Sequence, residues 1–574
     1  MKNNVVVPHQ WEQVVITTIY KGKGKKKELV NYRGIFLTSV LCKIFEKLIQ
    51  KRIDVVLNRV SKFQAGGRKR STVDQLFLLR GALDHMAYLN KPAYITLYDY
   101  RQAFDSLWLK ESILSLWNLG IRDVYLPLIY KLNEKAMVTV NTPYGRTTPF
   151  VIDQLVKQGA VLASNICSVS TGEICDQDFG APIGLLSLRP LAFVDDILKL
   201  NTKINDVRSS HAHTLSFSKL KKLELNEPKC CGLTVGGKKN IKFPELYIND
   251  ILVQIVKSAK YLGDIINSKN NNEDMFIERG NKAVGKLISI FASVNEVTLG
   301  AYLYSALLLM YHSFYIAALI FNCQSWTNIS NKDITKLQTL QLKYLKKMLR
   351  VPQATANCFV FLESGVLPIE HEIWRRQFTY LHTILNLESD DPVRAMYDQQ
   401  KKLPGEKNWA NNMEELRIRY NLAPTDEEIQ EMDLSKFKDL VRSNIRAFVF
   451  KELLRENLTK SKTKHLRYTS YTQQQYITKL PPKLMYIMLR IRCGMLNTIH
   501  DRPYLFTSID KCRLCGIGDE SIQHILNCYV ISDKIQTVSP SLFTDELDTG
   551  YAEEVARYVE QFYTAEEEVA ELAV

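Results

Sequence analysis

The chain has 574 residues, too many for one compact core, so we expect several domains. An apolar content of 46% argues against a disordered protein, and eleven scattered cysteines do not suit a secreted disulfide scaffold. The net charge of +14 suits nucleic acid or an acidic membrane surface, although a basic protein without such a partner has the same composition. The start, MKNNVVVPHQWEQ, lacks a signal-peptide pattern, so we do not expect secretion.

The N-terminal region reads as a strand, a basic loop and an amphipathic helix. Val14 to Tyr20 form an apolar strand pattern, and the loop KGKGKKKE follows it. In the next segment Ile44 and Leu48 recur at helical spacing, with Glu46 assigned to the polar face. The glycine-rich basic turn FQAGGRKRSTVDQL precedes another helix, which its serine or threonine would cap.

Between residues 93 and 200 short strands and helices alternate, as in an α/β or α+β domain. The strand pattern AYITLY ends directly before Asp99. Further along, the apolar runs LAFV and ILKL flank Asp195 and Asp196, which predicts a hairpin with adjacent carboxylates at its tip.

These three aspartates predict a magnesium site. Adjacent carboxylates repel and raise each other's pKa unless a cation neutralises them. Two Mg²⁺ ions can clamp the attacking and leaving oxygens of a phosphoryl transfer, and each needs only one or two carboxylates. The alternative is that Asp195-Asp196 is an ordinary turn dipeptide, but apolar strands on both sides and Asp99 at a second strand end favour the metal site.

From about residue 275 onward helical patterns dominate, for example in 332–349 and 437–454. Residues 301–326 carry no formal charge and are long enough to cross a bilayer. Polar residues and aromatics spread along this run favour a helix buried between other helices, so we expect no membrane partner.

Near the C-terminus, Cys512, Cys515, His524 and Cys528 have the spacing of a zinc site. Three thiolates and one imidazole would fill a structural Zn²⁺ site, with unpaired reduced cysteines as the alternative reading. We expect nearby basic residues to contact phosphates; these are Arg492, Arg502, Lys511 and Arg513.

Seven segments resemble, in this order along the chain, the motifs of non-LTR retrotransposon (LINE-type) reverse transcriptases. They are WEQVVITTIYKGKGKKKELVNYRGIFLTSVLCKIFEKLIQKRI, FQAGGRKRSTVDQL, YITLYDYRQAFDSL, VKQGAVLASNICSVST, LAFVDDILKL, LELNEPKC and AKYLGDIIN. The resemblance implies an α+β right-hand polymerase with fingers, palm and thumb, a helical C-terminal region and a small Cys-His zinc motif. We expect fingers and palm in 1–275, a helical thumb and connection in 276–400, a helical linker in 401–505, and the zinc-knuckle-like region with an acidic tail in 506–574.

The resemblance also implies roles for individual residues. Asp99 and Asp195 would be direct Mg²⁺ ligands, with Asp196 beside them as the third catalytic carboxylate. The dNTP would be bound by residues from four motifs: Arg68 at the triphosphate, Phe104 as the gate that rejects a ribose 2′-OH, Gln158 and Gly159 on the dNTP and template side, and Lys229 at the leaving pyrophosphate. Without the family, a core aromatic is the preferred interpretation of Phe104, and a solvated lysine is an equal alternative for Lys229.

The implied activity is RNA-directed DNA synthesis, with an RNA template, a DNA primer or target, dNTPs, two catalytic Mg²⁺ ions and one structural Zn²⁺ ion as partners and cofactors. Such chemistry needs RNA from the cytoplasm and DNA in the nucleus, so we expect the chain in both. We expect it to lack its own endonuclease domain. The alternative is a polymerase-dead, retroelement-derived nucleic-acid-binding protein, because Gly67 replaces an aromatic residue of the family and Ala163-Ser164 its Ser-Pro.

Overall fold

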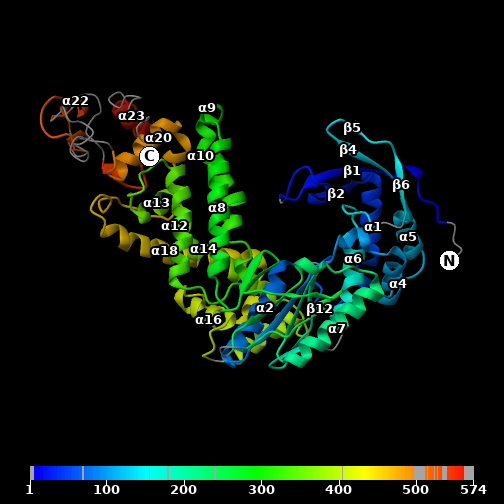
Figure 1. Ribbon diagram of the computed structural model, residues 1–574. Helices are drawn as coiled ribbons and strands as arrows, with labels where there is room; N and C mark the ends of the chain where they lie inside the picture. Colours follow the sequence, from blue (N-terminus) through cyan, green and yellow to red (C-terminus); the bar gives the residue numbers. More distant parts are fainter. Residues whose placement is uncertain are drawn as a thin grey trace. The chain divides into compact units, whose positions relative to one another are not determined.

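The computed structural model places most of the chain in two compact units (Figure 1). Unit 1 comprises residues 1–274, 325–328 and 386–412, and unit 2 comprises residues 275–324, 329–385 and 413–574. The four domains expected from the sequence stay predictions. Within both units, the structure describes residues 5–22, 24–67, 70–153, 156–176, 180–237, 241–403, 405–496, 511–512, 515–521, 524–525, 528–532 and 540–560.

Unit 1 contains two larger sheets. In the first, the strand order is β2-β1-β4-β5 with β6 paired to β4, and the apolar side chains of Val14, Phe36, Ala136 and Val138 form its core. The second has the order β14-β11-β3-β10-β9, with β3 antiparallel to both neighbours. The strands are β1 (Gln13–Tyr20), β2 (Tyr32–Leu37), β3 (Ala93–Tyr98), β4 (Lys135–Thr142), β5 (Gly145–Arg146), β6 (Phe150–Asp153), β9 (Leu191–Phe193), β10 (Asp196–Asn201), β11 (Cys231–Val235) and β14 (Gln254–Ile255).

Three short hairpins and a set of helices complete unit 1. The hairpins pair β7 (Ala181–Ile183) with β8 (Leu186–Leu188), β12 (Tyr247–Ile248) with β13 (Ile251–Leu252), and β15 (Ser258–Tyr261) with β16 (Asp264–Asn267). The helices are α1 (Val40–Leu57), α2 (Thr72–Tyr88), α3 (Ala103–Ser106), α4 (Leu109–Leu119), α5 (Tyr125–Glu134), α6 (Ala163–Gly172), α7 (Ile204–Lys221) and α15 (Pro392–Lys401).

Helix α2 is capped as predicted. The predicted division of α1 into an apolar and a polar face is not observed at Ile44, Glu46 and Leu48. Ser71 and Asp74 form a capping box at the start of α2. In α1, Glu46 is 2% exposed, whereas Ile44 and Leu48 are each 54% exposed. The assignment of Glu46 to the solvent face was therefore wrong, because its carboxylate accepts a tertiary hydrogen bond from the Val161 amide (2.7 Å).

Helices make up the regular structure of unit 2 among its described residues (Figure 1). They include α9 (Glu296–Leu299), α10 (Leu303–Met310), α11 (Ile316–Leu319), α12 (Asn331–Met348), α13 (Asn357–Ser364), α14 (Ile369–Leu385), α17 (Asp426–Glu431), α18 (Leu434–Leu458), α19 (Tyr476–Lys479), α20 (Pro482–Arg492), α22 (Tyr529–Ser532) and α23 (Thr549–Glu560). The boundary between the units falls within α8 (Glu273–Ser293) and α16 (Trp409–Arg419).

The apolar run 301–326 is not one continuous helix. Helix α10 leads into a π-helical turn at Tyr311–Tyr315 and then into the short α11. Among the described residues, no helix has the length and apolar character needed to span a membrane. Tyr311, Tyr315 and Leu319 are buried, which agrees with the expected packing between helices.

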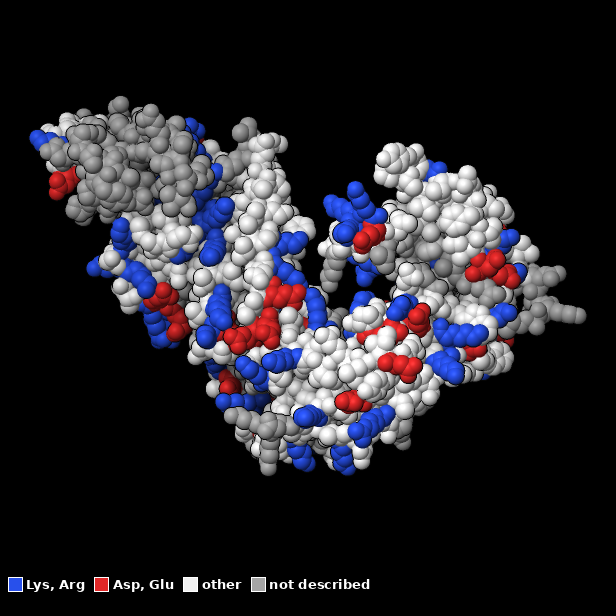
Figure 2. All heavy atoms as spheres, in the orientation of Figure 1, with Lys and Arg blue, Asp and Glu red and all other residues white. Residues whose placement is uncertain are grey.

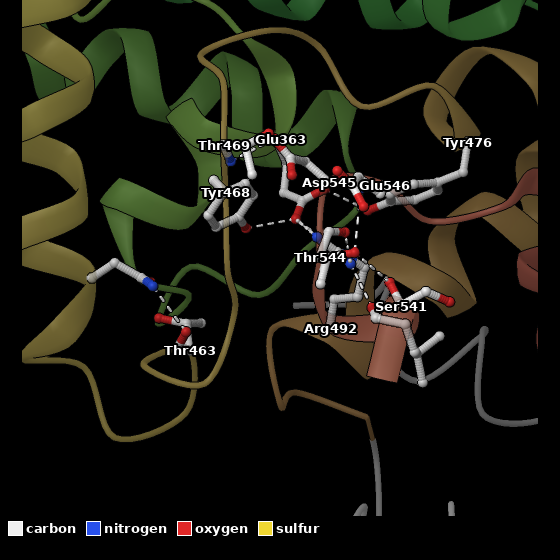
Figure 3. Close-up of polar contacts among 12 residues, drawn as sticks. Glu363, Thr463, Tyr468, Thr469, Tyr476, Arg492, Ser541, Thr544, Asp545 and Glu546 are labelled. Atoms are coloured by element: carbon white, nitrogen blue, oxygen red, sulfur yellow. Dashed lines mark hydrogen bonds and ion pairs between the residues drawn. The ribbon is translucent and has the colours of Figure 1, made fainter. Parts of the chain in front are cut away.

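A buried ion pair stands at the centre of a polar cluster in unit 2, drawn in Figure 3. Glu363 of α13 and Arg492 of α20 are both fully buried, with the guanidinium Nη2 2.9 Å from the carboxylate. The hydroxyls of Tyr468 and Tyr476 donate to the two carboxylate oxygens at 2.7 Å each. Arg492 also donates to the Thr544 carbonyl oxygen at 3.0 Å. The cluster thus joins α13, α20 and the segment around residue 544, and its charges are balanced within it.

Candidate active site

The three predicted aspartates lie together in the second sheet of unit 1. Asp99 directly follows β3, and Asp196 is the first residue of β10. Strands β3 and β10 are antiparallel with Ile197 opposite Tyr98, so the next pair in this register is Asp196 and Asp99. Asp195 lies in the turn between β9 and β10. The strand end and the hairpin predicted from the sequence therefore meet at one end of the sheet, where β3 ends and β10 begins.

The electrostatics of the cluster combine burial with repulsion between like charges, which one ion pair offsets in part. Burial raises the pKa of Asp195, and the negative charge of Asp99 raises it further. Burial, Asp195 and Asp99 together raise the pKa of Asp196 to about 6. Because the Asp196 side chain is exposed to solvent, repulsion by its two neighbours is the firmer of these causes. The positive charges of Arg33 and Lys229 act in the opposite direction on both carboxyls.

Asp99 has two hydrogen-bond donors from the segment after α7. The Asn226 amide and the Lys229 ammonium each donate to the same carboxylate oxygen at 2.8 Å. Lys229 was predicted, but Asn226 and Arg33 were missed. Asn226 stands in the same short segment as Lys229, and Arg33 is in the strand that follows the basic loop, so the polar residues of these two segments were the available sequence signal.

The carboxylate cluster fits divalent cations. Asp99 follows β3, whereas Asp195 and Asp196 belong to the β9–β10 hairpin. Burial and the charge of neighbouring carboxylates raise the pKa of Asp195 and Asp196, and carboxylate oxygens are the ligands that Mg²⁺ prefers. A bound cation would remove the repulsion that these carboxylates otherwise bear.

The segment Gln158-Gly159 is fixed against β2 and α1. The Phe36 amide donates to the Gln158 carbonyl oxygen at 2.8 Å. Gly159 has φ +111°, and a Cβ at this position would lie 3.0 Å from the Phe36 carbonyl oxygen, so a side chain here would be strained. Two residues on, the Val161 amide is held by Glu46, as described above. This backbone is consequently held at defined points, while the Gln158 side chain is half-buried.

The other predicted dNTP residues are less completely placed. Phe104 lies in α3, five residues after Asp99, and is half-buried. Arg68, the candidate for the triphosphate, lies outside the described residues. In the same basic turn, Arg70 forms an ion pair with the buried carboxylate of Asp391. Arg70 is therefore committed to a structural contact within unit 1.

The four predicted zinc ligands come together in unit 2. The ligand atoms of Cys512, Cys515, His524 and Cys528 all lie within 4.8 Å of one another. The Cys515 Sγ is 3.3 Å from His524 Nε2. The Gly516 amide donates to the Cys512 carbonyl oxygen at 2.8 Å, which closes the turn between the first two cysteines. Three thiols and one imidazole in this arrangement fit a tetrahedral Zn²⁺ site.

Hydrogen bonds within the cluster favour the thiolate form of Cys515. Burial opposes ionisation of Cys515, but hydrogen bonds from the Ile517 amide and His524 lower its pKa to about 7.

The prediction that Arg492 contacts phosphates was wrong, because its guanidinium is fully buried and paired with Glu363. Lys511 is exposed, whereas Arg502 and Arg513 lie outside the described residues.

Comparison with known proteins gives one family match. Residues 24–266 match the family described as reverse transcriptase (RNA-dependent DNA polymerase). This range contains all three aspartates and the segments that position them.

Individual relatives agree with this match. A retrovirus-related Pol polyprotein from a type-1 retrotransposable element of Popillia japonica is 24% identical over 274 residues, which are 45% of this chain and 38% of the relative. The RNA-directed DNA polymerase from mobile element jockey of Drosophila melanogaster is 23% identical over 366 residues, 60% of this chain and 38% of the relative. The chain thus spans under two fifths of the length of these curated relatives.

Among solved structures, apo telomerase from Candida tropicalis aligns at 12% identity with a TM-score of 0.37, covering 76% of this chain and 70% of that chain. The expected α+β class is confirmed by the family match and the mixed sheets and helices of unit 1. Residues 24–266 therefore match the reverse transcriptase family, and the relatives are a Pol polyprotein of a retrotransposable element and RNA-directed DNA polymerases of a mobile element and of a transposon.

Proposed function

We propose that this chain is the RNA-directed DNA polymerase of a non-LTR retrotransposon. In the proposed reaction the 3′-OH of a primer attacks the α-phosphate of a dNTP, a new phosphodiester bond forms, and pyrophosphate leaves. The observation that carries the proposal is that Asp99, Asp195 and Asp196 lie together at one end of the sheet, within the residues that match the reverse transcriptase family. Clustered carboxylates with raised pKa suit metal-assisted phosphoryl transfer.

Asp99 and Asp195 would hold the metal ions, with Asp196 adding negative charge beside them. Two Mg²⁺ ions supply charge neutralisation and activation of the attacking and leaving oxygens. Lys229 now donates to Asp99. Competition for this carboxylate by a cation would weaken that contact and leave the ammonium available to stabilise, or donate a proton to, the leaving pyrophosphate.

The dNTP would be bound by side chains from several motifs. Arg68 would contact the triphosphate, and Gln158 with Gly159 would line the dNTP and template side. Because Arg70 is paired with Asp391, Arg68 is the better candidate for contact with the triphosphate. Phe104 would exclude a ribose 2′-OH by its bulk and so select deoxynucleotides.

An RNA template and a DNA primer or target are the proposed macromolecular partners. The net charge of +14 favours polyanions, and Figure 2 shows blue side chains gathered around the loop that joins β1 and β2. The basic residues of this loop are exposed; they include Lys21, Lys25, Lys26 and Lys27. Such residues bind phosphates without regard to sequence. Because the chemistry needs RNA from the cytoplasm and DNA in the nucleus, we propose that the chain functions in both compartments.

Primer extension on an RNA template tests the polymerase. Asp195→Ala should lower extension by about three orders of magnitude or more, since several kcal/mol of transition-state stabilisation would be lost. Template–primer binding should change little. Asp206→Ala, which removes one exposed carboxylate at the start of α7, is the matched control and should extend normally. Binding without extension by the unsubstituted chain would favour the polymerase-dead alternative.

For the Cys-His cluster we propose one structural Zn²⁺ ion. All four ligand positions would come from the protein, which leaves no open position for catalysis. The purified chain should contain one equivalent of zinc by elemental analysis, and Cys515→Ala should lose most of it. Cys231→Ala, at a half-buried cysteine of β11, should retain the zinc. Equal zinc contents in both variants would contradict the assignment.

A further inference from the structure

The turn that carries Asp195 contains a strained backbone. Val194 and Asp195 form the two-residue loop between β9 and β10, and Val194 has φ +60°. A positive φ at the first loop residue is usually a glycine position in such hairpins. A β-branched residue adopts it only when surrounding contacts determine the conformation.

Gln64 supplies those contacts from the glycine-rich basic turn before α2. Its side-chain oxygen accepts from the Val194 amide at 2.9 Å and from the Gly66 amide at 2.9 Å. Its side-chain nitrogen donates to the Val194 carbonyl oxygen at 3.1 Å and to Thr171 Oγ1 at 3.0 Å. One fully buried amide thus binds both polar groups of the strained residue. Only an amide of this length offers the acceptor and the donors together.

The backbone around Gln64 is built to bring this side chain to the turn. The Ala192 amide donates to the Phe63 carbonyl oxygen at 3.0 Å, and the Ala65 amide donates to the Ala192 carbonyl oxygen at 2.9 Å. These bonds add the segment to the free edge of β9. A Cβ on Gly66 would lie 2.4 Å from the Val194 backbone nitrogen, so this approach requires glycine.

Helix α6 completes the clamp from another side. Thr171 Oγ1 donates to the Val194 carbonyl oxygen at 2.6 Å and accepts from Gln64. Both side chains are fully buried, so solvent does not replace these bonds if one partner is lost.

We propose that Gln64 is a positioning residue, which holds Val194 in its strained conformation and thereby orients the Asp195 carboxylate for metal binding. The inference rests on the proposed polymerase function and adds to it a residue that touches neither metal nor nucleotide. Residues that orient a metal ligand commonly change metal affinity or activity about 10- to 100-fold when they are replaced.

The test compares Gln64→Met with Gln341→Met. Gln341 is also fully buried, and its amide makes two donor bonds, as Gln64 does, and one acceptor bond where Gln64 makes two, but it lies in unit 2. At matched folded fraction, Gln64→Met should lower kcat about 10- to 100-fold and raise the Mg²⁺ concentration that gives half-maximal extension. The dNTP KM should change less than about threefold. Gln341→Met should change none of these, and equal losses in both variants would overturn the proposal.

A rescue experiment separates positioning from general packing. Glycine adopts a positive φ without strain, so Val194→Gly combined with Gln64→Met should recover about fivefold or more of the kcat that Gln64→Met loses. Val194→Gly alone is the reference, and absence of recovery would overturn the proposal. If the unsubstituted chain does not extend primers, the polymerase function fails and the Mg²⁺-induced rise in melting temperature decides. A smaller rise in Gln64→Met than in Gln341→Met would then support the positioning role, and equal rises would refute it.

Discussion

In unit 2 the carboxylate of Glu363 meets a guanidinium and two tyrosine hydroxyls, whereas in unit 1 Asp99, although paired with Lys229, still raises the pKa of the nearby carboxyls of Asp195 and Asp196. The first cluster is fully buried and its charges cancel within the protein. The second has raised carboxyl pKa values, and its turn carries a strained valine.

The difference distinguishes a structural polar cluster from a functional one. Charges that are satisfied internally hold elements together and need no ligand. Charges that are left in mutual repulsion cost stability in the isolated chain, and the cost is recovered when a cation binds. The aspartate cluster was predicted from the sequence, whereas the Glu363 cluster was visible there only as scattered polar residues.

The largest effect on stability is expected where the Glu363–Arg492 cluster of unit 2 loses a charge. Arg492→Met should destabilise unit 2 by about 3–5 kcal/mol, because it leaves the Glu363 carboxylate buried without its cation. Hydrogen exchange of α13 amides as a function of urea measures this locally. Arg455→Met, at an exposed pair with Glu452 on α18, should cost less than about 1 kcal/mol.

A double variant shows whether the cost comes from charge imbalance. Adding Glu363→Leu to Arg492→Met should destabilise unit 2 by less than the sum of the single effects, because no unpaired charge remains. An additive result would mean that packing, not charge balance, dominates this cluster.

A smaller effect is expected from a single neutral donor of the same cluster. Tyr476→Phe removes one hydrogen bond to the Glu363 carboxylate and should cost roughly 1.5–3 kcal/mol by the same exchange measurement. Tyr302→Phe, at a side chain that is 77% exposed, is the control. An unchanged exchange rate in Tyr476→Phe would show that this oxygen of Glu363 finds another donor.

The sequence predicted those parts of the molecule whose signals are local. The strand before Asp99, the hairpin at Asp195-Asp196 and the capped start of α2 follow from short apolar patterns and turn residues, and each is present. The spacing of the Cys-His cluster likewise predicted four ligand atoms close together.

What the sequence did not predict depends on partners distant along the chain. Glu46 is buried because the Val161 amide needs an acceptor, and Arg492 is buried because Glu363 lies on another helix. Helical periodicity assigns a charged side chain to solvent and contains no information about either partner. The same applies to Gln64, whose partners in the β9–β10 turn lie 130 residues further along the chain.

The smallest expected effect is a gain in stability, and it concerns the aspartate cluster of unit 1. Burial and Asp99 raise the pKa of Asp195, so the folded chain binds this proton more tightly than the unfolded chain does. The stability of the metal-free protein should therefore fall as pH rises through the folded-state pKa. Asp195→Asn removes the charge and should stabilise the metal-free chain at pH 8, by roughly 0.5–1.5 kcal/mol once solvent screening of this half-buried group is allowed for.

Thermal unfolding of unit 1 in EDTA measures this gain, which should shrink as the pH is lowered toward about 3, where the carboxyl is mostly protonated in both states. Addition of Mg²⁺ should reverse the order, because the unsubstituted chain gains binding free energy that Asp195→Asn loses. A variant that is less stable than the unsubstituted chain in EDTA at pH 8 would show that Asp195 is held by contacts that stabilise its charge. The site would then resemble the Glu363 cluster, and the unbalanced carboxylates would no longer argue for a bound cation.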